Sequence, residues 1–211
     1  MEANRRLLAV TGIRVVDLFA PFPIAGTLAV FGDPGSGVNV VAMEVMQNLC
    51  RRYGATATCY VTVDGMFTEQ NVPGWVDKLR VGPVVTSIVV AETAHIDVVG
   101  PKDMVARLLP FAVDHKAADA WVVLRRAVLA TGRLPGVELH ESGSKHLAGD
   151  ARKLAERVSR EIDRGNDALA NYLSQPFLVA EPWTSKPGVT TEREEMLLTV
   201  RGLLRPHVTG A

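Results

Sequence analysis

Residues 28–48 read Leu-Ala-Val-Phe-Gly-Asp-Pro-Gly-Ser-Gly-Val-Asn-Val-Val-Ala-Met-Glu-Val-Met-Gln-Asn, and this stretch decides the fold that the sequence predicts. A short apolar run at 28–31 has the length and composition of a buried strand. Glycines follow it closely, and apolar positions then recur at spacings of three and four, which is typical of a helix. Strand, glycine-rich turn and helix, in this order, are the layout of a phosphate-binding loop, G-x-x-x-x-G-K-[ST].

The loop keeps its glycines and lacks its usual polar side chains. Gly32, Gly35 and Gly37 stand where the motif needs glycine, whereas Val38 stands at the Lys position and Asn39 at the Ser/Thr position. A lysine contributes a charge-assisted hydrogen bond to phosphate worth ~1.5–3 kcal/mol. The sequence therefore predicts a loop that keeps the glycines of the motif and lacks the side chains that bind phosphate and metal.

Two further residues of the loop oppose the binding of an anion. Asp33 adds a negative charge that repels phosphate, and Pro34 has no backbone N–H to donate. Together with the missing lysine, these changes are expected to weaken nucleotide binding ~100-fold or more, since a factor of ten corresponds to ~1.4 kcal/mol. We predict a structural turn that holds no triphosphate. The alternative is a backbone nest that still accepts an anion.

Composition excludes several classes of partner. The 211 residues suffice for one large domain, or for a core domain with a small satellite. Basic and acidic residues number 23 each, so no net charge recruits nucleic acid or an anionic membrane. No apolar run approaches the ~20 residues that span a bilayer. With Cys50 and Cys59 expected to be free thiols, we predict a cytoplasmic protein without nucleic acid and without direct membrane insertion.

The first two thirds of the chain alternate between strand and helix patterns, which predicts a parallel α/β sheet. A short helix or turn is expected within residues 11–22. Strands are predicted at 28–31, 56–63, 86–91 and 96–99. Helices are predicted at 38–52, 73–80, 103–109 and 116–131.

The remaining third of the chain predicts helices only. Residues 148–164 have an amphipathic pattern, in which Arg152/Glu156 and Arg157/Glu161 are four-apart pairs worth ~0.3 kcal/mol each.

A further helix is predicted at 167–173, and a capping box of Thr191 and Glu194 predicts the start of the last one. We therefore predict two domains, a nucleotide-binding-type core over 1–140 and a helical domain over 141–211.

Two separate stretches resemble the catalytic beta subunit of rotary ATP synthases. Residues 11–22, Thr-Gly-Ile-Arg-Val-Val-Asp-Leu-Phe-Ala-Pro-Phe, are similar to the family's T-G-I-K-V-V-D-L-L-A-P-Y. Residues 173–181, Leu-Ser-Gln-Pro-Phe-Leu-Val-Ala-Glu, are similar to its L-S-Q-P-F-x-V-A-E. A weaker match runs from Val123 to Pro135. The resemblance implies a shortened RecA-like P-loop fold: a parallel sheet flanked by helices, followed by a small C-terminal helical domain.

The departures from this family concern catalysis. Its apolar strand ending in Asp, which organises Mg²⁺, has no counterpart in the sequence. Asp64 falls on the family's general-base Glu position but lacks the neighbouring Arg, and a strand-end turn residue is the alternative reading. The family's N-terminal β-barrel has no counterpart before Thr11, so its six-subunit ring is not expected here. Because phosphoryl transfer needs a metal, a cationic clamp and a positioned water, the resemblance implies a degenerate, pseudo-ATPase site.

An apolar slot for adenine is the second feature that the resemblance implies. The family's adenine-pocket residues carry over to Phe177, Ala180 and Trp183, with Leu134 on the opposite wall. The alternative is that these side chains only pack the helical unit onto the sheet. The resemblance therefore implies at most a weakly bound adenine nucleotide as cofactor.

The histidines do not predict a metal site. His95 with Asp97, and His140 with Glu141 and His146, lack a recognised ligand spacing, so we expect surface or capping roles.

Three functions remain open at this point. The first is a non-catalytic protein that serves as a subunit, assembly factor or regulatory partner, bound to another protein or to a second copy. The second is a weak adenine-nucleotide binder. The third is a residual ATPase completed by residues of a partner.

Overall fold

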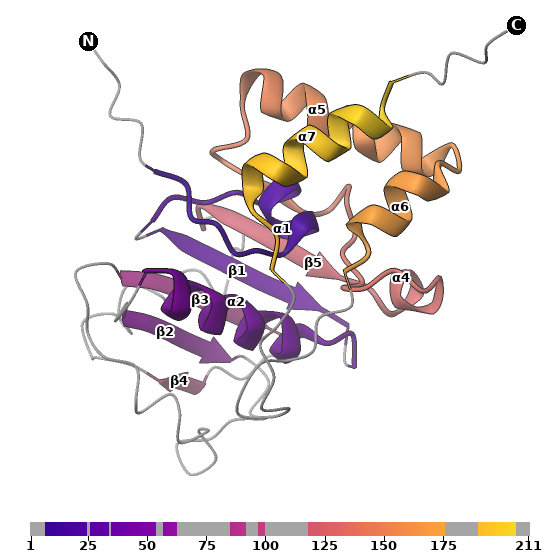
Figure 1. Cartoon of the computed structure of the whole chain (residues 1–211). Coiled ribbons are helices and arrows are strands. Elements are labelled where there is room, and N and C mark those ends of the chain that lie inside the picture. The colour runs from indigo at the N-terminus through magenta and orange to yellow at the C-terminus, as the bar shows by residue number, and fades with distance from the viewer. Residues whose placement is uncertain are drawn as a thin grey trace, which may run out of the picture.

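The computed structural model describes residues 7–24, 26–33, 35–53, 57–62, 85–91, 97–99, 118–175 and 190–205, and all structural statements refer to these residues. They form a six-stranded sheet with helices around it, in the strand order β4-β2-β3-β1-β5-β6 (Figure 1). The strands are β1 (Thr27–Gly32), β2 (Ala57–Thr62), β3 (Val85–Ala91), β4 (Asp97–Val99), β5 (Ala120–Leu124) and β6 (Gly143–Ser144).

β1 lies inside the sheet and pairs in parallel with β3 on one side and β5 on the other. β2 continues the parallel part beyond β3, and the short strands β4 and β6 close the two edges in antiparallel pairing. Leu28, Ala29 and Val30 are fully buried, as is usual for a parallel strand covered on both faces. The expected parallel α/β sheet is therefore confirmed, with antiparallel strands added at its edges.

The helices are α1 (Arg14–Phe19), α2 (Val38–Tyr53), α4 (Arg126–Ala130), α5 (Gly149–Asp163), α6 (Asp167–Leu173) and α7 (Arg193–Leu203). α2 packs on β1, β2 and β3, and Figure 1 shows it lying along the sheet. α1, α5, α6 and α7 pack on one another and gather near β1 and β5. The glycine-rich loop thus runs from a buried strand into a helix that covers the sheet.

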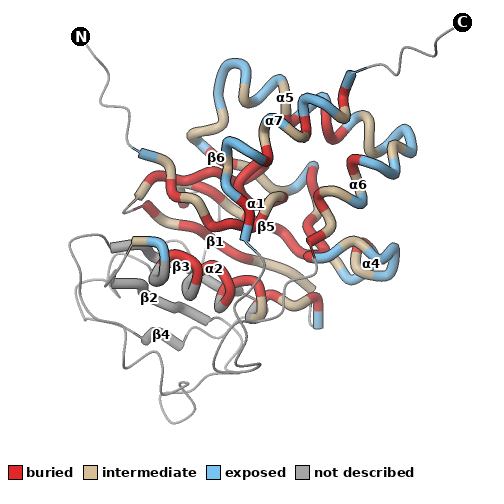
Figure 2. Tube along the Cα trace, in the orientation of Figure 1, coloured by how far each residue is buried: buried red, intermediate tan, exposed pale blue. Residues whose placement is uncertain are grey.

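Among the described residues, a buried apolar cluster joins β1 and β5 to α1, α2, α5, α6 and α7, and its members lie in red segments of Figure 2. Leu28 of β1, Leu18 of α1 and Leu49 of α2 belong to it, as do Leu169 of α6 and Val200 of α7. Residues before and after position 140 therefore share one core. The domain boundary between 140 and 141 stays a prediction.

The predicted helix over 116–131 is wrong, because this segment forms β5 and then the short α4. The run Ala-Trp-Val-Val-Leu at 120–124 contains β-branched and aromatic side chains that fit a buried pleat, and its pairing with β1 overrides the helical spacing. β6 also lies in a region where the sequence predicted helices only.

The capping box predicted for the last helix is also wrong. α7 begins after Glu192, whose side chain makes no cap hydrogen bond. Thr191 Oγ1 instead accepts a hydrogen bond from Arg14 Nε at 3.0 Å. A long-range contact has thus replaced the local one, because the chain before α7 packs against the loop that precedes α1.

Neither four-apart pair predicted on α5 forms among the described residues. Arg157 donates to the Leu204 carbonyl at 2.7 Å, and Glu161 instead accepts from Arg164 at 2.8 Å. Arg152 donates its Nε to the Leu147 carbonyl. Exposed ion pairs contribute little, so nearby carbonyls and other charges compete with them successfully.

The other predicted elements are confirmed within a few residues where the structure describes them, including the short helix near the N-terminus. The helices predicted at 73–80 and 103–109 lie outside the described residues. Within the described chain, no helix combines the length and the apolar character needed to cross a membrane.

Candidate functional site

The glycine-rich loop joins β1 to α2 with the geometry that its glycines permit. Gly35 and Gly37 have φ angles of +77° and +87°, in the left-handed region that favours glycine. Ser36 N donates to the Asp33 carbonyl at 2.9 Å, which closes a tight four-residue turn. Val41 N donates to the Gly37 carbonyl at 3.0 Å, so α2 begins directly after the loop. The strand–loop–helix layout of the motif is therefore present.

The side chain of Ser36 lies inside the loop. Ser36 is 2% exposed, and its Oγ has no hydrogen-bond partner among the described residues. A Cβ added to Gly32 would lie 2.4 Å from Ser36 Oγ and 2.7 Å from the Leu124 carbonyl. Gly32 is therefore required because the serine and β5 approach it closely. The only local sign of this role is that a small residue stands between two glycines.

Several backbone donors of the loop are already used. Asp33 N donates to the Leu124 carbonyl at 3.1 Å, and Ser36 N is engaged within the turn. Pro34 has no N–H. The two loop glycines with positive φ and the first turn of α2 remain as the amide donors for an anion.

Val38 points into the core. Its exposed fraction is 0%, and it belongs to the buried apolar cluster. The position that carries a cation in the motif thus carries an apolar side chain packed against the sheet. Asn39 lies in the first turn of α2, and its side chain is outside the described part of the structure.

Asp33 is tied to the segment that follows β5. Its Oδ1 accepts a hydrogen bond from Arg125 Nη1 at 2.9 Å, and its Oδ2 accepts one from the Arg126 backbone N–H at 3.1 Å. These bonds, first the backbone one and then the guanidinium one, hold the pKa of Asp33 below its usual range. Arg125 also donates its Nε to Glu141 at 3.1 Å, so one guanidinium is shared between two carboxylates. The loop therefore carries a fixed, ionised carboxylate.

The first stretch that carries the family resemblance folds around a buried carboxylate. Asp17 accepts hydrogen bonds from Thr11 N at 2.9 Å, Thr11 Oγ1 at 2.7 Å and Gly12 N at 2.9 Å. Burial raises the pKa of Asp17 to about 6, against the opposing effect of these hydrogen bonds. The role of this aspartate was not identified from the sequence.

The second stretch meets the first one directly. Gln175 Oε1 accepts from Arg14 N, and Gln175 Nε2 donates to the Gly12 carbonyl, both at 3.0 Å. Thr191 N donates to the same carbonyl at 3.0 Å. Both stretches thus form one joint between α1, the end of α6 and the start of α7.

Leu134 is 44% exposed and lies beside the segment that leads to the predicted adenine residues. Its N–H donates to Ser174 Oγ at 3.0 Å, and its carbonyl accepts from Gln175 N at 2.6 Å. The other residues of the slot, and the general-base candidate, lie outside the described residues: Phe177, Ala180, Trp183 and Asp64.

The histidines in the described part of the chain pair with acidic side chains. His140 Nε2 lies 3.0 Å from Asp163, and His146 Nε2 lies 3.0 Å from Asp119. No group of three or more potential metal ligands is found among the described residues.

No known protein-family model matches the chain. Among solved structures, the chain is similar to one described as a prototypical ATPase from the type III secretion system of pathogenic bacteria. The TM-score is 0.56 at 10% sequence identity, over 97% of this chain and 89% of that one. At this identity the likeness shows the fold alone. It shows an α/β fold shared with that ATPase, and it does not single out the ATP synthase beta subunit.

Proposed function

We propose that this chain is a pseudo-ATPase: a degenerate relative of the ATP synthase beta subunit that serves as a subunit, assembly factor or regulatory partner of a larger complex. The observation that carries this function is Val38, fully buried in the apolar core at the position where the motif places its lysine. Ser36, which lies inside the loop, supports the same conclusion.

The charges around the loop also support a non-catalytic function. Transfer of a phosphoryl group relies on cations that neutralise the developing negative charge. Arg125 lies close to the loop, but it is already bonded to Asp33 and Glu141. An incoming triphosphate would have to displace two carboxylates from that guanidinium.

A fold without its catalytic side chains still has surfaces that can bind another protein. We therefore propose a protein partner as the ligand. The partner is a different chain or a second copy of this one, in the cytoplasm. The joint at Gln175 supports this function, because it fixes the loop before α1 to the end of α6 through contacts within the chain itself.

A phosphate-release assay combined with affinity purification tests this function. We expect no ATP turnover above background from the wild type, and co-purification of a partner or a second copy at constant stoichiometry. The double variant Val38→Lys/Asn39→Thr restores the motif, and Thr131→Lys, at an exposed site, controls for the added charge. Turnover by the wild type that disappears in a Gly37→Val variant would refute the pseudo-ATPase assignment. A monomer without any partner would refute the interaction function.

Weak binding of an adenine nucleotide is the second candidate, and the position of Leu134 favours it. Leu134 is exposed, and its backbone bonds Ser174 and Gln175, which come shortly before Phe177 in the sequence. If the slot binds the ring alone, adenosine and ATP should bind equally well, and Leu134→Asp should abolish both. A residual ATPase completed by a partner's Lys or Arg would instead show turnover only in the purified complex.

A further inference from the structure

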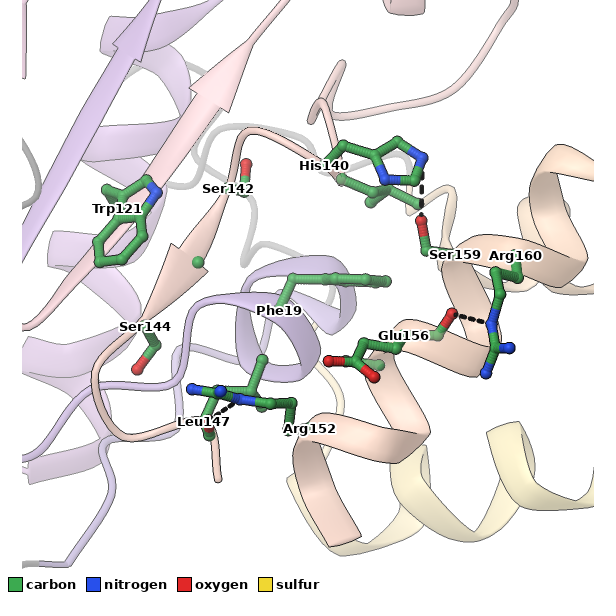
Figure 3. Close-up of a pocket in the computed structure, with 13 residues that line it drawn as sticks. Phe19, Trp121, His140, Ser142, Ser144, Leu147, Arg152, Glu156, Ser159 and Arg160 are labelled. Carbon is green, nitrogen blue, oxygen red and sulfur yellow. Dashed lines mark hydrogen bonds between the residues drawn. The ribbon is translucent and has the colours of Figure 1, made fainter. Parts of the chain in front are cut away.

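A pocket of about 440 Å³ opens between α5 and the β5–β6 edge of the sheet (Figure 3). None of its lining residues belongs to the loop at 32–39. Phe19, Trp121 and Leu147 contribute apolar surface, and α5 contributes Arg152 and Glu156. The volume lies within the range of sites for small molecules, ~300–1,000 Å³.

Trp121 is held in place from two directions. Its indole N–H donates to the Glu141 carbonyl at 2.9 Å. Its ring also packs against Gly143, where an added Cβ would lie only 2.8 Å from Trp121 Cζ2. Phe19 of α1, which is 4% exposed, lies in the middle of the pocket lining in Figure 3. The pocket thus contains aromatic side chains whose positions are fixed by the fold.

Three charged residues of α5 line this pocket, Arg152, Glu156 and Arg160, and Arg160 donates its Nε to the backbone carbonyl of Glu156 at 3.3 Å. Arg152 donates its Nε to the Leu147 carbonyl at 2.9 Å, which orients the guanidinium and leaves its two terminal amino groups for other acceptors. The carboxylate of Glu156 is directed toward Phe19 (Figure 3). Among the described residues, no ion pair joins Arg152 or Glu156 to another side chain. The pocket therefore offers an unpaired cation and an unpaired anion one helical turn apart.

We propose that this pocket binds an aromatic α-amino acid. The ligand's carboxylate would accept the paired terminal N–H groups of Arg152, a strong and directional contact. Its ammonium group would pair with Glu156, and its ring would pack against Trp121 and Phe19.

The charge pattern selects this class of ligand over simpler ones. A plain anion would leave the Glu156 carboxylate without a partner, and a plain cation would leave Arg152 without one. A zwitterion with an aromatic ring satisfies both charges and the aromatic wall at once.

Calorimetric titration of the full chain with L-phenylalanine tests the pocket. L-Phenylalanine should bind saturably, whereas 3-phenylpropionate, phenethylamine and L-alanine, which each lack one of its three groups, should bind at least tenfold more weakly. Arg152→Gln and Glu156→Gln should each weaken the binding of L-phenylalanine at least tenfold. Lys153→Gln, on the same helix but outside the pocket, should leave the affinity unchanged.

Three results would overturn this assignment. One is the absence of saturation by L-phenylalanine at millimolar concentration. Another is 3-phenylpropionate binding as tightly as L-phenylalanine and surviving Glu156→Gln, which would indicate an anion site. The third is adenosine monophosphate binding more tightly than L-phenylalanine and being lost in Arg152→Gln, which would indicate a nucleotide site. Unchanged melting temperatures of the variants exclude unfolding as the cause.

Discussion

Ser36 and Val38, at the end of the glycine-rich loop and the start of α2, are both buried. Ser36 is buried inside the loop, where its Oγ lies close to Gly32, and Val38 is buried in the core. Neither side chain can donate a charged hydrogen bond to phosphate. At the scale of single residues, the loop is therefore a packed turn.

Replacing Gly32 by alanine should disturb this packing. The new Cβ would lie 2.4 Å from Ser36 Oγ and 2.7 Å from the Leu124 carbonyl, so the loop must shift away from β5. We expect the free energy of unfolding to fall by roughly 1–3 kcal/mol, measured by urea denaturation. Gly202→Ala is the matched control, because nothing lies within 4 Å of its added Cβ. It should stabilise α7 by up to ~1 kcal/mol, and equal effects of both changes would contradict the packed turn.

The raised pKa of Asp17 is expected to make the free energy of unfolding depend on pH. Burial raises its pKa in the folded protein from 3.8 to about 6, so the folded state holds this proton more tightly than the unfolded state. The stabilisation is fully present below about pH 4 and is lost as the pH rises through about 6, a change of roughly 3 kcal/mol. Asp17→Asn should remove this dependence from urea denaturation curves measured between these pH values. A slope that persists in the variant would assign the effect to other groups.

At the scale of elements, the loop before α1 and the end of α6 are held together by Gln175. This side chain is 1% exposed and bonds both Arg14 N and the Gly12 carbonyl. Arg14 adds a second tie, because its guanidinium lies 4.4 Å from the centre of the Tyr172 ring. The described residues of the two stretches that resemble the ATP synthase beta subunit are therefore connected directly, through the hydrogen bonds of Gln175.

Gln175→Ala should loosen this joint. The partly buried Arg14 N–H would lose its acceptor, which is expected to lower the free energy of unfolding by roughly 1–3 kcal/mol. Asn171→Ala, on the exposed face of α6, should change it by less than about 0.5 kcal/mol. Thermal melting of both variants compares the two positions, and a neutral Gln175→Ala would argue against the joint.

Elements with strong periodicity could be predicted from the sequence, and those fixed by distant contacts could not. β1, α2 and α6 follow from local patterns alone. β5 could not be recognised, because its pairing with β1 is decided by residues about ninety positions earlier. The start of α7 was misjudged for the same reason, since Thr191 bonds Arg14 instead of capping the helix.

In the candidate site, too, the local features could be predicted from the sequence and the contacts between distant residues could not. The glycine positions and the missing lysine are local features, and the structure places Gly32, Gly35, Gly37 and Val38 together in one loop. The hydrogen bond between Asp33 and Arg125 joins residues 92 positions apart, so it cannot be predicted from a local sequence pattern.

At the scale of the whole molecule, the sheet and the C-terminal helices share one apolar cluster. Val158 of α5, Leu169 of α6 and Met196 of α7 are buried in the same cluster as Ile13 and Leu28. An element that contributes to a common core cannot unfold without exposing its neighbours.

Unfolding should therefore occur in a single cooperative transition. Differential scanning calorimetry should give one peak, with equal calorimetric and van't Hoff enthalpies. Two separate peaks would show instead that residues 1–140 and 141–211 unfold independently. Gln175→Ala should lower the temperature of the single peak without splitting it.

Calorimetric titration with ATP and adenosine in the presence of Mg²⁺ shows whether the loop after β1 holds a triphosphate. We predict no difference between the two ligands up to millimolar concentration, because Ser36 lies inside the loop and Val38 supplies no charge. Saturable binding of ATP at micromolar concentration, absent for adenosine and lost in Gly37→Val, would show that the loop does hold a triphosphate.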